Sequence, residues 1–229
     1  MMESSLKNEI HSARGSIYLF LKNCLYDMPN EAFYKMIEDM LSQLSQIVNE
    51  SENTDMKNGY NGMLKFINAV QSLSGKELDE FNLHTSREYT ACLCLPGTAY
   101  QEESYYISED HILRQESNDD MIKLFHKYGF AMSADLQADY DNVCIELAFM
   151  SKLAYMSADT EDNKEYSNLI SEQLNFHKNH FDKWIYHFYD KVIEQKIIES
   201  RLYKYIAEFS KGFIQEDKLL LEELNSSNN

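Results

Sequence analysis

The sequence predicts an all-α protein, folded as a single-domain helical bundle of about nine to eleven helices. Only 7 glycines and 2 prolines occur in 229 residues, whereas the tight turns of an all-β chain of this length would use many more. Apolar residues recur at three- and four-residue steps along most of the chain, which is the helical spacing. Hydrophobic residues make up 44% of the chain and aromatic residues 13%, which is enough for a packed core.

The first half of the chain contains helices separated by turn signals. Pro29 ends the first helix, because a proline cannot continue it, and Asn30 is a suitable N-cap for the second. The segment Glu50–Gly59 is polar and turn-rich, and is interpreted as a loop. In order, the expected elements are a helix over 6–24, a helix with apolar positions from 33 to 48, the loop, a helix over 60–73 broken at Ser74 and Gly75, and a less regular helix over 81–95 that stops at Pro96 and Gly97.

The middle of the chain is less regular. Residues 98–107 lack a helical period and are expected to form an ordered loop with a short extended piece. A helix then follows, capped by Ser117 or Asn118 and stopped by Gly129, which favours the left-handed backbone of a helix end. Residues 131–138 are interpreted as a loop, and a subdivision of the domain would fall there.

The last part of the chain is again helical. The helix that contains Val143 is apolar on two faces and is expected to be buried nearly all round. Three further helices are expected over 164–175, 176–195 and 197–212. The all-helical domain is assigned to residues 1–221, and residues 222–229 are expected to form a frayed tail.

The charge balance limits the kinds of partner. The net charge is −17, from 38 acidic against 21 basic residues, and the four arginines are far apart in the sequence. Nucleic acids and anionic membranes need clustered Lys and Arg, so neither is an expected partner. A basic partner is favoured through faster encounter, although the acidity also serves solubility alone.

The cysteines and the N-terminal residues indicate a reduced, cytoplasmic protein. Cys92 and Cys94 are separated by one residue, which matches neither a redox C-x-x-C motif nor a zinc knuckle. Lys7 and Glu9 interrupt the first apolar residues, so no secretory leader is expected. No apolar run approaches the roughly 18 residues of a membrane span.

No recognisable catalytic or cofactor motif occurs. His177 and His180 lie one helical turn apart, but no Glu-x-x-His motif supplies further ligands, so a packed or capping role is favoured over a metal site. Gly75-Lys76 is followed by Glu77, which breaks the P-loop pattern, and no G-x-S-x-G occurs. No enzyme activity, metal or cofactor is therefore predicted, and whether a nucleotide binds stays open. A metal-dependent hydrolase that uses the two histidines is the alternative from another class.

Acidic and aromatic residues gather before the central helix. Asp139 or Asp141 can cap its first turn, and a carboxylate left unused by the cap would face solvent as a receptor for an arginine side chain. Asp135 lies in the same segment. The walls of such a site would be Tyr140, Tyr105 and Tyr106.

Several segments, in this order, resemble the TorD/DmsD/NarJ group of redox enzyme maturation chaperones. They are Glu88-Tyr89-Thr90 followed by Pro96 and Glu103-Ser104-Tyr105-Tyr106, then Tyr128-Gly129-Phe130, Asp139-Tyr140 with Glu146-Leu147-Ala148-Phe149-Met150, Phe176…His180…Trp184…Phe188, and Leu202-Tyr203-x-x-Ile206-Ala207. The resemblance covers roughly Glu88 to Phe213. Where the family has Pro-Pro-Asp-His, this chain keeps Asp139 but has Gln137, Ala138 and Tyr140 in place of the prolines and the histidine.

The resemblance implies a cytoplasmic all-helical chaperone without catalysis. It would bind the twin-arginine signal peptide, or the body, of the apo catalytic subunit of a molybdenum-cofactor oxidoreductase, aid cofactor insertion and prevent premature export. A monomer or a swapped dimer is implied, with the loops 50–59 and 131–138 as hinges. A helical scaffold for another basic segment is a further alternative. The predicted peptide-binding residues are Asp139, Tyr140, Glu103, Ser104, Tyr105, Glu146 and Pro96. For Glu146, a buried structural hydrogen bond is the alternative of equal weight.

Overall fold

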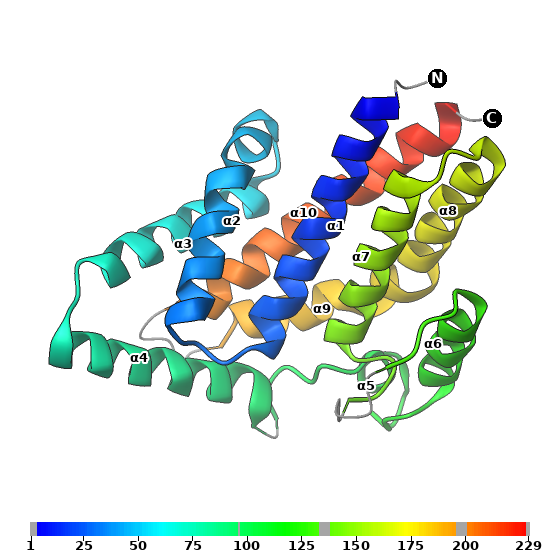
Figure 1. Cartoon of the computed structure of the whole chain (residues 1–229). Coiled ribbons are helices and arrows are strands. Elements are labelled where there is room, and N and C mark those ends of the chain that lie inside the picture. Colours follow the sequence, from blue (N-terminus) through cyan, green and yellow to red (C-terminus); the bar gives the residue numbers. More distant parts are fainter. Residues whose placement is uncertain (1–3, 96, 133–137, 196–200, 228–229) are drawn as a thin grey trace. The chain divides into compact units, whose positions relative to one another are not determined.

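The computed structural model describes residues 4–95, 97–132, 138–195 and 201–227, and these residues are helical with short connections (Figure 1). The elements are α1 (Ser4–Tyr26), α2 (Glu31–Glu50), α3 (Thr54–Gln71), α4 (Gly75–Tyr89), the π-helical turn η1 (Thr90–Cys94), α5 (Glu103–Ile107), α6 (Glu116–Lys127), α7 (Val143–Asp159), α8 (Asn163–Phe176), the π-helical turn η2 (His177–Phe181), α9 (Asp182–Ile193) and α10 (Leu202–Ser227). Within the described ranges, extended pairing is limited to the isolated bridge between Glu102 and Asn142. The all-α prediction is confirmed.

The loop predicted at Glu50–Gly59 is wrong, because α3 already begins at Thr54. Asn53 caps this helix by accepting a hydrogen bond from the backbone N–H of Met56 at 3.0 Å. Gly59 serves close packing and not a turn, since a Cβ atom there would lie 2.2 Å from the backbone nitrogen of Phe209 in α10. The polar residues and glycines that suggested a loop are thus a helix cap and a helix contact.

The helix caps in the middle of the chain also differ from expectation. Helix α6 begins at Glu116, one residue before Ser117. The two predicted caps, Ser117 and Asn118, therefore lie inside the helix. The N-cap of α7 is Asn142, whose side chain accepts from the N–H of Cys144 at 3.0 Å, and not Asp139 or Asp141. The predicted stop of α6 is confirmed: Gly129 has φ +66° directly after the C-cap.

The C-terminal helices are longer and less regular than predicted. Residues 176–195 do not form one α-helix, because η2 inserts a wider π-helical turn before α9. Helix α10 continues beyond residue 212 and through most of the expected tail, to Ser227. Its buried apolar residues at Ile214 and Leu221 explain the extension, because they anchor this part of the helix in a core.

The described helices group into two compact units, each with its own packing. Unit 1 consists of residues 1–22, 101–186 and 217–229, and unit 2 of residues 23–100 and 187–216. In unit 1 the buried helix α7 packs on α1, where Ser151 donates to the carbonyl of Gly15 at 2.8 Å, and on α8. In unit 2 α2 packs on α3, and α3 packs closely on α10.

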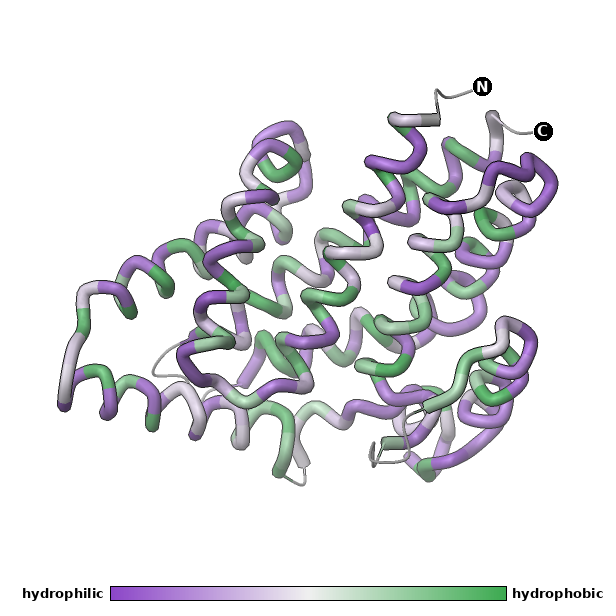
Figure 2. Tube along the Cα trace, viewed as in Figure 1, coloured by the Kyte–Doolittle hydropathy of each residue, from purple (hydrophilic) through white to green (hydrophobic). Residues whose placement is uncertain are grey.

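The hydropathy of the chain follows this packing. Figure 2 shows hydrophobic and hydrophilic stretches alternating along most of the helices. Helix α7 is the exception expected from the sequence, since it is buried along most of its length. Among the described residues, no helix combines the length and the apolar character that crossing a membrane would require. The assignment of one domain to 1–221 stays a prediction, and most of the proposed boundary at 131–138 lies outside the described residues.

Candidate functional site

The site in unit 1 is built where the starts of α5, α6 and α7 come together. Two backbone hydrogen bonds join the segment before α5 to the segment before α7: Glu103 N–H donates to the Asp141 carbonyl at 2.9 Å, and Val143 N–H donates to the Gln101 carbonyl at 2.7 Å. The bridge at Glu102 is a short extended piece inside residues 98–107, which were expected to form an ordered loop, but residues 103–107 form helix α5. The bridge holds Glu103, at the first position of α5, beside the first turn of α7.

Asp141 ties a third helix to this junction. Its side chain is fully buried, and Oδ2 accepts from the backbone N–H of Ser104 at 2.9 Å and from the hydroxyl of Ser117 in α6 at 2.8 Å. Asp141 therefore satisfies a first-turn N–H of α5, which explains why Asn142 is left to cap α7.

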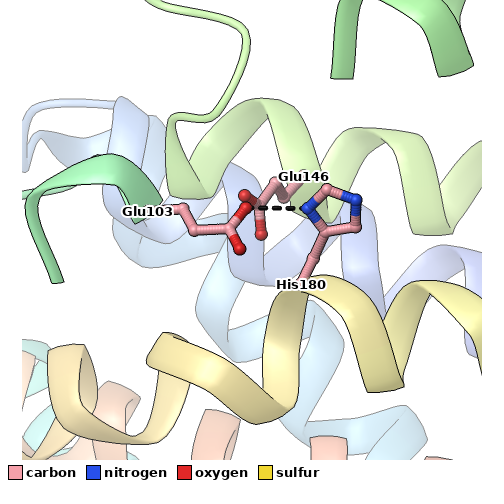
Figure 3. Close-up of side chains that lie close together, drawn as sticks. All are labelled: Glu103, Glu146 and His180. Carbon is pink, nitrogen blue, oxygen red and sulfur yellow. Dashed lines mark hydrogen bonds and ion pairs between the residues drawn. The ribbon is translucent and has the colours of Figure 1, made fainter. Parts of the chain in front are cut away.

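A buried cluster lies behind this junction and consists of Glu103, Glu146 and His180 (Figure 3). Their side chains point toward one another from α5, the first turn of α7 and η2. His180 Nδ1 lies 2.7 Å from Glu103 Oε2, and the Trp184 indole N–H donates to Glu146 Oε2 at 3.1 Å. The exposed fractions are 1% for Glu103, 0% for Glu146 and 6% for His180, so the cluster is shielded from water.

The electrostatics of the cluster are those of two carboxyl groups in a dry site. Burial, followed by the charge of Glu103, raises the pKa of Glu146 well above its ordinary value. Glu103 Oε1 and Glu146 Oε1 are both buried and have no hydrogen-bond donor among the described residues. The three side chains can hold a proton between them or serve as ligands for a cation.

A second, exposed site lies at Asp139. Its Oδ1 accepts a hydrogen bond from Arg114 Nε at 2.8 Å, and the exposed fraction of the side chain is 75% for Arg114 and 19% for Asp139. Arg114 has φ +59°, a left-handed conformation that costs a non-glycine residue roughly 1–2 kcal/mol. Its backbone N–H donates to the hydroxyl of Ser104 at 3.1 Å. The loop before α6 therefore holds Arg114 in a strained position against this carboxylate.

Aromatic and apolar side chains flank the exposed pair. Tyr140 packs edge-on against Phe125 in α6, with ring centroids 5.3 Å apart. Tyr105 stacks on His111 of the loop at 4.6 Å. The same loop region exposes Ile107, Ile112 and Leu113. A carboxylate, two half-buried tyrosines and exposed apolar residues thus belong to neighbouring stretches of unit 1.

The predicted site residues fall into three groups. Asp139, Tyr140 and Tyr105 are partly exposed beside the loop, whereas Glu103, Ser104 and Glu146 are buried and have partners inside unit 1. Their membership of a peptide site stays a prediction. Outside the described residues lie Pro96, Asp135 and Gln137. Tyr106, proposed as a wall, packs on Trp184 at 5.4 Å.

The two histidines that suggested a shared metal site contact different acidic residues. His180 faces Glu103, whereas His177 Nε2 lies 3.6 Å from Asp217 in α10. Sequence reasoning missed Arg114 altogether, and it missed that His180 meets two carboxylates. No spacing signal could have found these contacts, because His180 and Glu103 are 77 residues apart in the sequence.

Comparisons with known proteins place the region that contains both sites in one family. The family model described as nitrate reductase delta subunit matches residues 49–190. The chain is 26% identical over 151 residues to the chaperone protein TorD of Aliivibrio fischeri, an alignment that covers 64% of this chain and 67% of the relative. It is 24% identical over 176 residues to the TorD protein of Vibrio parahaemolyticus, with 74% and 77% covered, and 28% identical over 151 residues to that of a Shewanella species, with 63% and 66% covered.

Proposed function

This chain belongs to the nitrate reductase delta subunit family, which includes the TorD-type chaperones, and on that basis we propose that it is a dedicated maturation chaperone. Its client would be the apo catalytic subunit of a molybdenum-cofactor oxidoreductase. It would bind the twin-arginine signal peptide, the body of that subunit, or both, in the cytoplasm. Binding would keep the client accessible for cofactor insertion and away from the export machinery. The relatives named above are chaperones, and no catalytic step is assigned to this chain.

The observation that carries the peptide-binding role is the pairing of Asp139 with Arg114. This partly exposed carboxylate already accepts a guanidinium N–H, so its position suits the group that distinguishes a twin-arginine peptide. An arginine side chain binds a carboxylate through a planar, two-pronged donor face that lysine lacks. We infer that a client arginine replaces Arg114 at Asp139.

The exchange requires only local movement. Arg114 is 75% exposed, and surface ion pairs contribute roughly 0–1 kcal/mol, so its displacement costs little. A client arginine that also places its following residues on an apolar surface therefore has a net advantage over the resident side chain.

The surroundings of Asp139 fit the rest of such a peptide. A twin-arginine peptide continues from its basic start into an apolar segment, and exposed apolar residues lie before Arg114 in the sequence: Ile112 and Leu113 directly before it, and Ile107 at the end of α5. The net charge of −17 accelerates encounter with a basic segment. Ordering a flexible peptide costs roughly 2–5 kcal/mol, so we expect micromolar affinity.

The family loop is altered here, which bears on specificity. Ala138 and Tyr140 flank Asp139 in place of a proline and a histidine, so the loop lacks both a rigid residue and a group that titrates near neutral pH.

Two experiments test the proposal. Fluorescence anisotropy with a labelled peptide that contains an Arg-Arg pair and an apolar segment should give micromolar binding, and a Lys-Lys version should bind at least about tenfold more weakly. Equal affinity for both peptides would instead indicate a scaffold for basic segments in general.

The second experiment identifies the client. An affinity capture of the tagged chain from anaerobically grown source cells, read by mass spectrometry, should recover one large molybdenum-enzyme subunit. Reproducible recovery of an unrelated protein in its place would contradict the assigned class of client, whatever the peptide result.

A further inference from the structure

We propose that Glu103, Glu146 and His180 form a binding site for a single divalent transition-metal ion of the zinc type. This goes beyond the chaperone role and does not depend on it. The three side chains are brought together by α5, α7 and η2, and each offers one ligand atom within 4.8 Å of the other two (Figure 3). A zinc ion held tetrahedrally at about 2.0–2.2 Å spaces its donors roughly 3.4 Å apart, so small side-chain shifts would bring these three atoms to ligand spacing, with water in the fourth position.

The donor set selects the kind of ion. Two carboxylate oxygens and one imidazole nitrogen suit zinc and its divalent neighbours, whereas a calcium or magnesium ion prefers oxygen ligands alone. The nearby thiol Cys144 belongs to the same helix as Glu146 but contacts the Lys22 carbonyl at 3.8 Å. The ligands are therefore the nitrogen and oxygen atoms of the cluster.

The negative charge of the cluster and its unsatisfied carboxylate oxygens favour a bound cation. Glu103 Oε1 and Glu146 Oε1 are buried and lack a donor among the described residues, so each would contribute an unsatisfied acceptor in a dry site. The charges that act most strongly on Glu146 are those of Glu103 and Asp141, and both are negative. A divalent cation would neutralise this excess and engage the unsatisfied oxygens.

Neighbouring residues already hold two of the ligands in orientation. The Trp184 indole N–H fixes the Glu146 carboxylate at 3.1 Å, and the His180 ring stacks on Phe176 with centroids 4.7 Å apart. Such supporting contacts orient metal ligands in proteins and commonly change affinity by 10–100-fold when they are removed. The π-helical turn η2, a form that is frequent at functional sites, sets the position of His180.

An entry route lies on the surface beside His180. His180 lines an open cavity of about 320 Å³, together with Asp120, Glu172, Lys123 and Lys183. Acidic and basic side chains both line this cavity, so its charge does not repel a cation. Neither Glu103 nor Glu146 lines this cavity, so a metal ion would reach the cluster past the His180 ring.

The competing occupant is a proton. In the absence of metal, a proton shared between the facing carboxyl groups of Glu103 and Glu146 would satisfy their unpaired oxygens instead. Metal binding would expel that proton, so the two occupants are distinguished by proton release and by their dependence on pH.

The test uses the full chain without an affinity tag, dialysed against a chelator and titrated with zinc chloride at pH 7 by calorimetry in two buffers of different ionisation enthalpy. We expect one zinc ion per chain, release of protons, and a rise in melting temperature with zinc. Cobalt(II) as a second probe should give visible absorption from a site with nitrogen and oxygen ligands.

Matched variants locate the ion. Glu146→Gln should weaken zinc binding by at least about 100-fold, since losing a ligand exceeds the effect of a supporting contact. Trp184→Phe keeps all three ligands and should weaken binding by about tenfold, which covers the case in which a ligand variant fails to fold. The control is His126→Gln on the exposed surface of α6, which should bind zinc like the unmodified chain.

Two results would overturn the proposal. One is the absence of stoichiometric zinc and cobalt binding, which would leave the proton as the occupant. The other is zinc binding that survives Glu146→Gln and disappears in His126→Gln, which would place the ion on the surface. Peptide affinity enters neither result, so failure here leaves the chaperone proposal standing.

Discussion

Unit 1 contains two arginine–aspartate pairs of the same chemistry in opposite environments. Arg14 and Asp217 are buried, with 4% and 0% of their side chains exposed, whereas Arg114 and Asp139 are 75% and 19% exposed. The comparison teaches that burial and the number of partners, and not the residue types, decide whether a guanidinium is fixed in place or can be exchanged.

Arg14 and Asp217 of the buried pair also hydrogen-bond to further buried side chains. Arg14 contacts Asp217 through two nitrogens, at 2.5 and 3.0 Å, and also donates to Gln173 at 2.7 Å and to His11 Nδ1 at 2.8 Å. Tyr18 donates to the same Asp217 carboxylate at 2.7 Å. Burial and the nearby Arg14 lower the pKa of His11 to about 3, so this histidine stays neutral and its Nδ1 accepts a hydrogen bond from Arg14.

The exposed pair has one contact in place of this network. Only the 2.8 Å bond from Arg114 Nε to Asp139 joins the two side chains among the described contacts, and the arginine backbone is strained. Water can replace either partner at little cost. The buried pair therefore holds α1 and α10 together within unit 1, whereas the exposed pair is suited to exchange.

The largest expected effect is on stability. Arg14→Met keeps the length of the side chain but leaves Asp217 buried without its cation, and should lower the free energy of unfolding by about 3–5 kcal/mol. The matched control Arg114→Met should change it by less than about 1 kcal/mol. Urea unfolding measures both, and equal effects for the two variants would refute the contrast.

The pH dependence of stability should reveal the buried pair. Burial alone would raise the pKa of Asp217, but the Arg14 charge, the nearby His177 and the hydrogen bonds from Arg14 outweigh it and hold this pKa well below its ordinary value. The stabilisation is then present above about pH 4 and is lost as the pH falls toward the folded-state value. Asp217→Asn should remove this acid-sensitive component, whereas Asp139→Asn should leave it intact.

A buried carboxyl group whose pKa is raised should behave in the opposite way. In unit 2, Glu88 accepts from the backbone N–H of Tyr203 at the start of α10, and burial raises the pKa of Glu88 to about 7 despite that bond. The folded state then holds a proton that the unfolded chain releases, so stability falls as the pH rises from about 4.5 to about 7. Glu88→Gln should flatten the stability profile in that window, and an unchanged slope would contradict this assignment.

The exposed pair should matter for binding and not for stability. Asp139→Asn removes a charge-assisted hydrogen bond to the client arginine, worth about 1.5–3 kcal/mol, and should weaken an Arg-Arg peptide by roughly tenfold or more. Asp120→Asn, which removes an acidic residue from an exposed ion pair on α6, is the charge-matched control. A similar loss in both variants would mean that net charge, and not Asp139, attracts the peptide.

The smallest predicted effect is an increase in peptide affinity. Arg114→Ala removes the resident competitor for Asp139, so peptide affinity should increase by roughly two- to fivefold, the equivalent of an exposed ion pair of up to about 1 kcal/mol. Anisotropy at low salt gives the best sensitivity, because salt screens the exposed pair.

The fold was predictable from local patterns, with errors where a residue type has two uses. Helical spacing, Asn30 and Gly129 gave correct elements and ends. Gly59 suggested a turn but allows α3 to approach α10, and Asp141 suggested a cap for α7 but binds Ser104 and Ser117. Local sequence does not distinguish these uses, because the deciding partner lies on a distant segment.

The candidate sites were predictable only in part, for the same reason. Asp139 could be singled out, because the family resemblance covers it. Its partner Arg114 and the meeting of Glu103, Glu146 and His180 depend on tertiary packing alone. The sequence therefore predicts a binding region around Asp139, but it does not predict which side chains already contact each group.

The most direct test of the account is a double-mutant cycle for the Arg-Arg peptide on the unmodified chain, Arg114→Ala, Asp139→Asn and the double variant. If a client arginine replaces Arg114 at Asp139, Arg114→Ala will tighten binding only when Asp139 is present, and the double variant will bind as weakly as Asp139→Asn. If Arg114→Ala changes affinity equally with and without Asp139, or Asp139→Asn leaves affinity unchanged in a folded protein, the exchange at Asp139 does not occur.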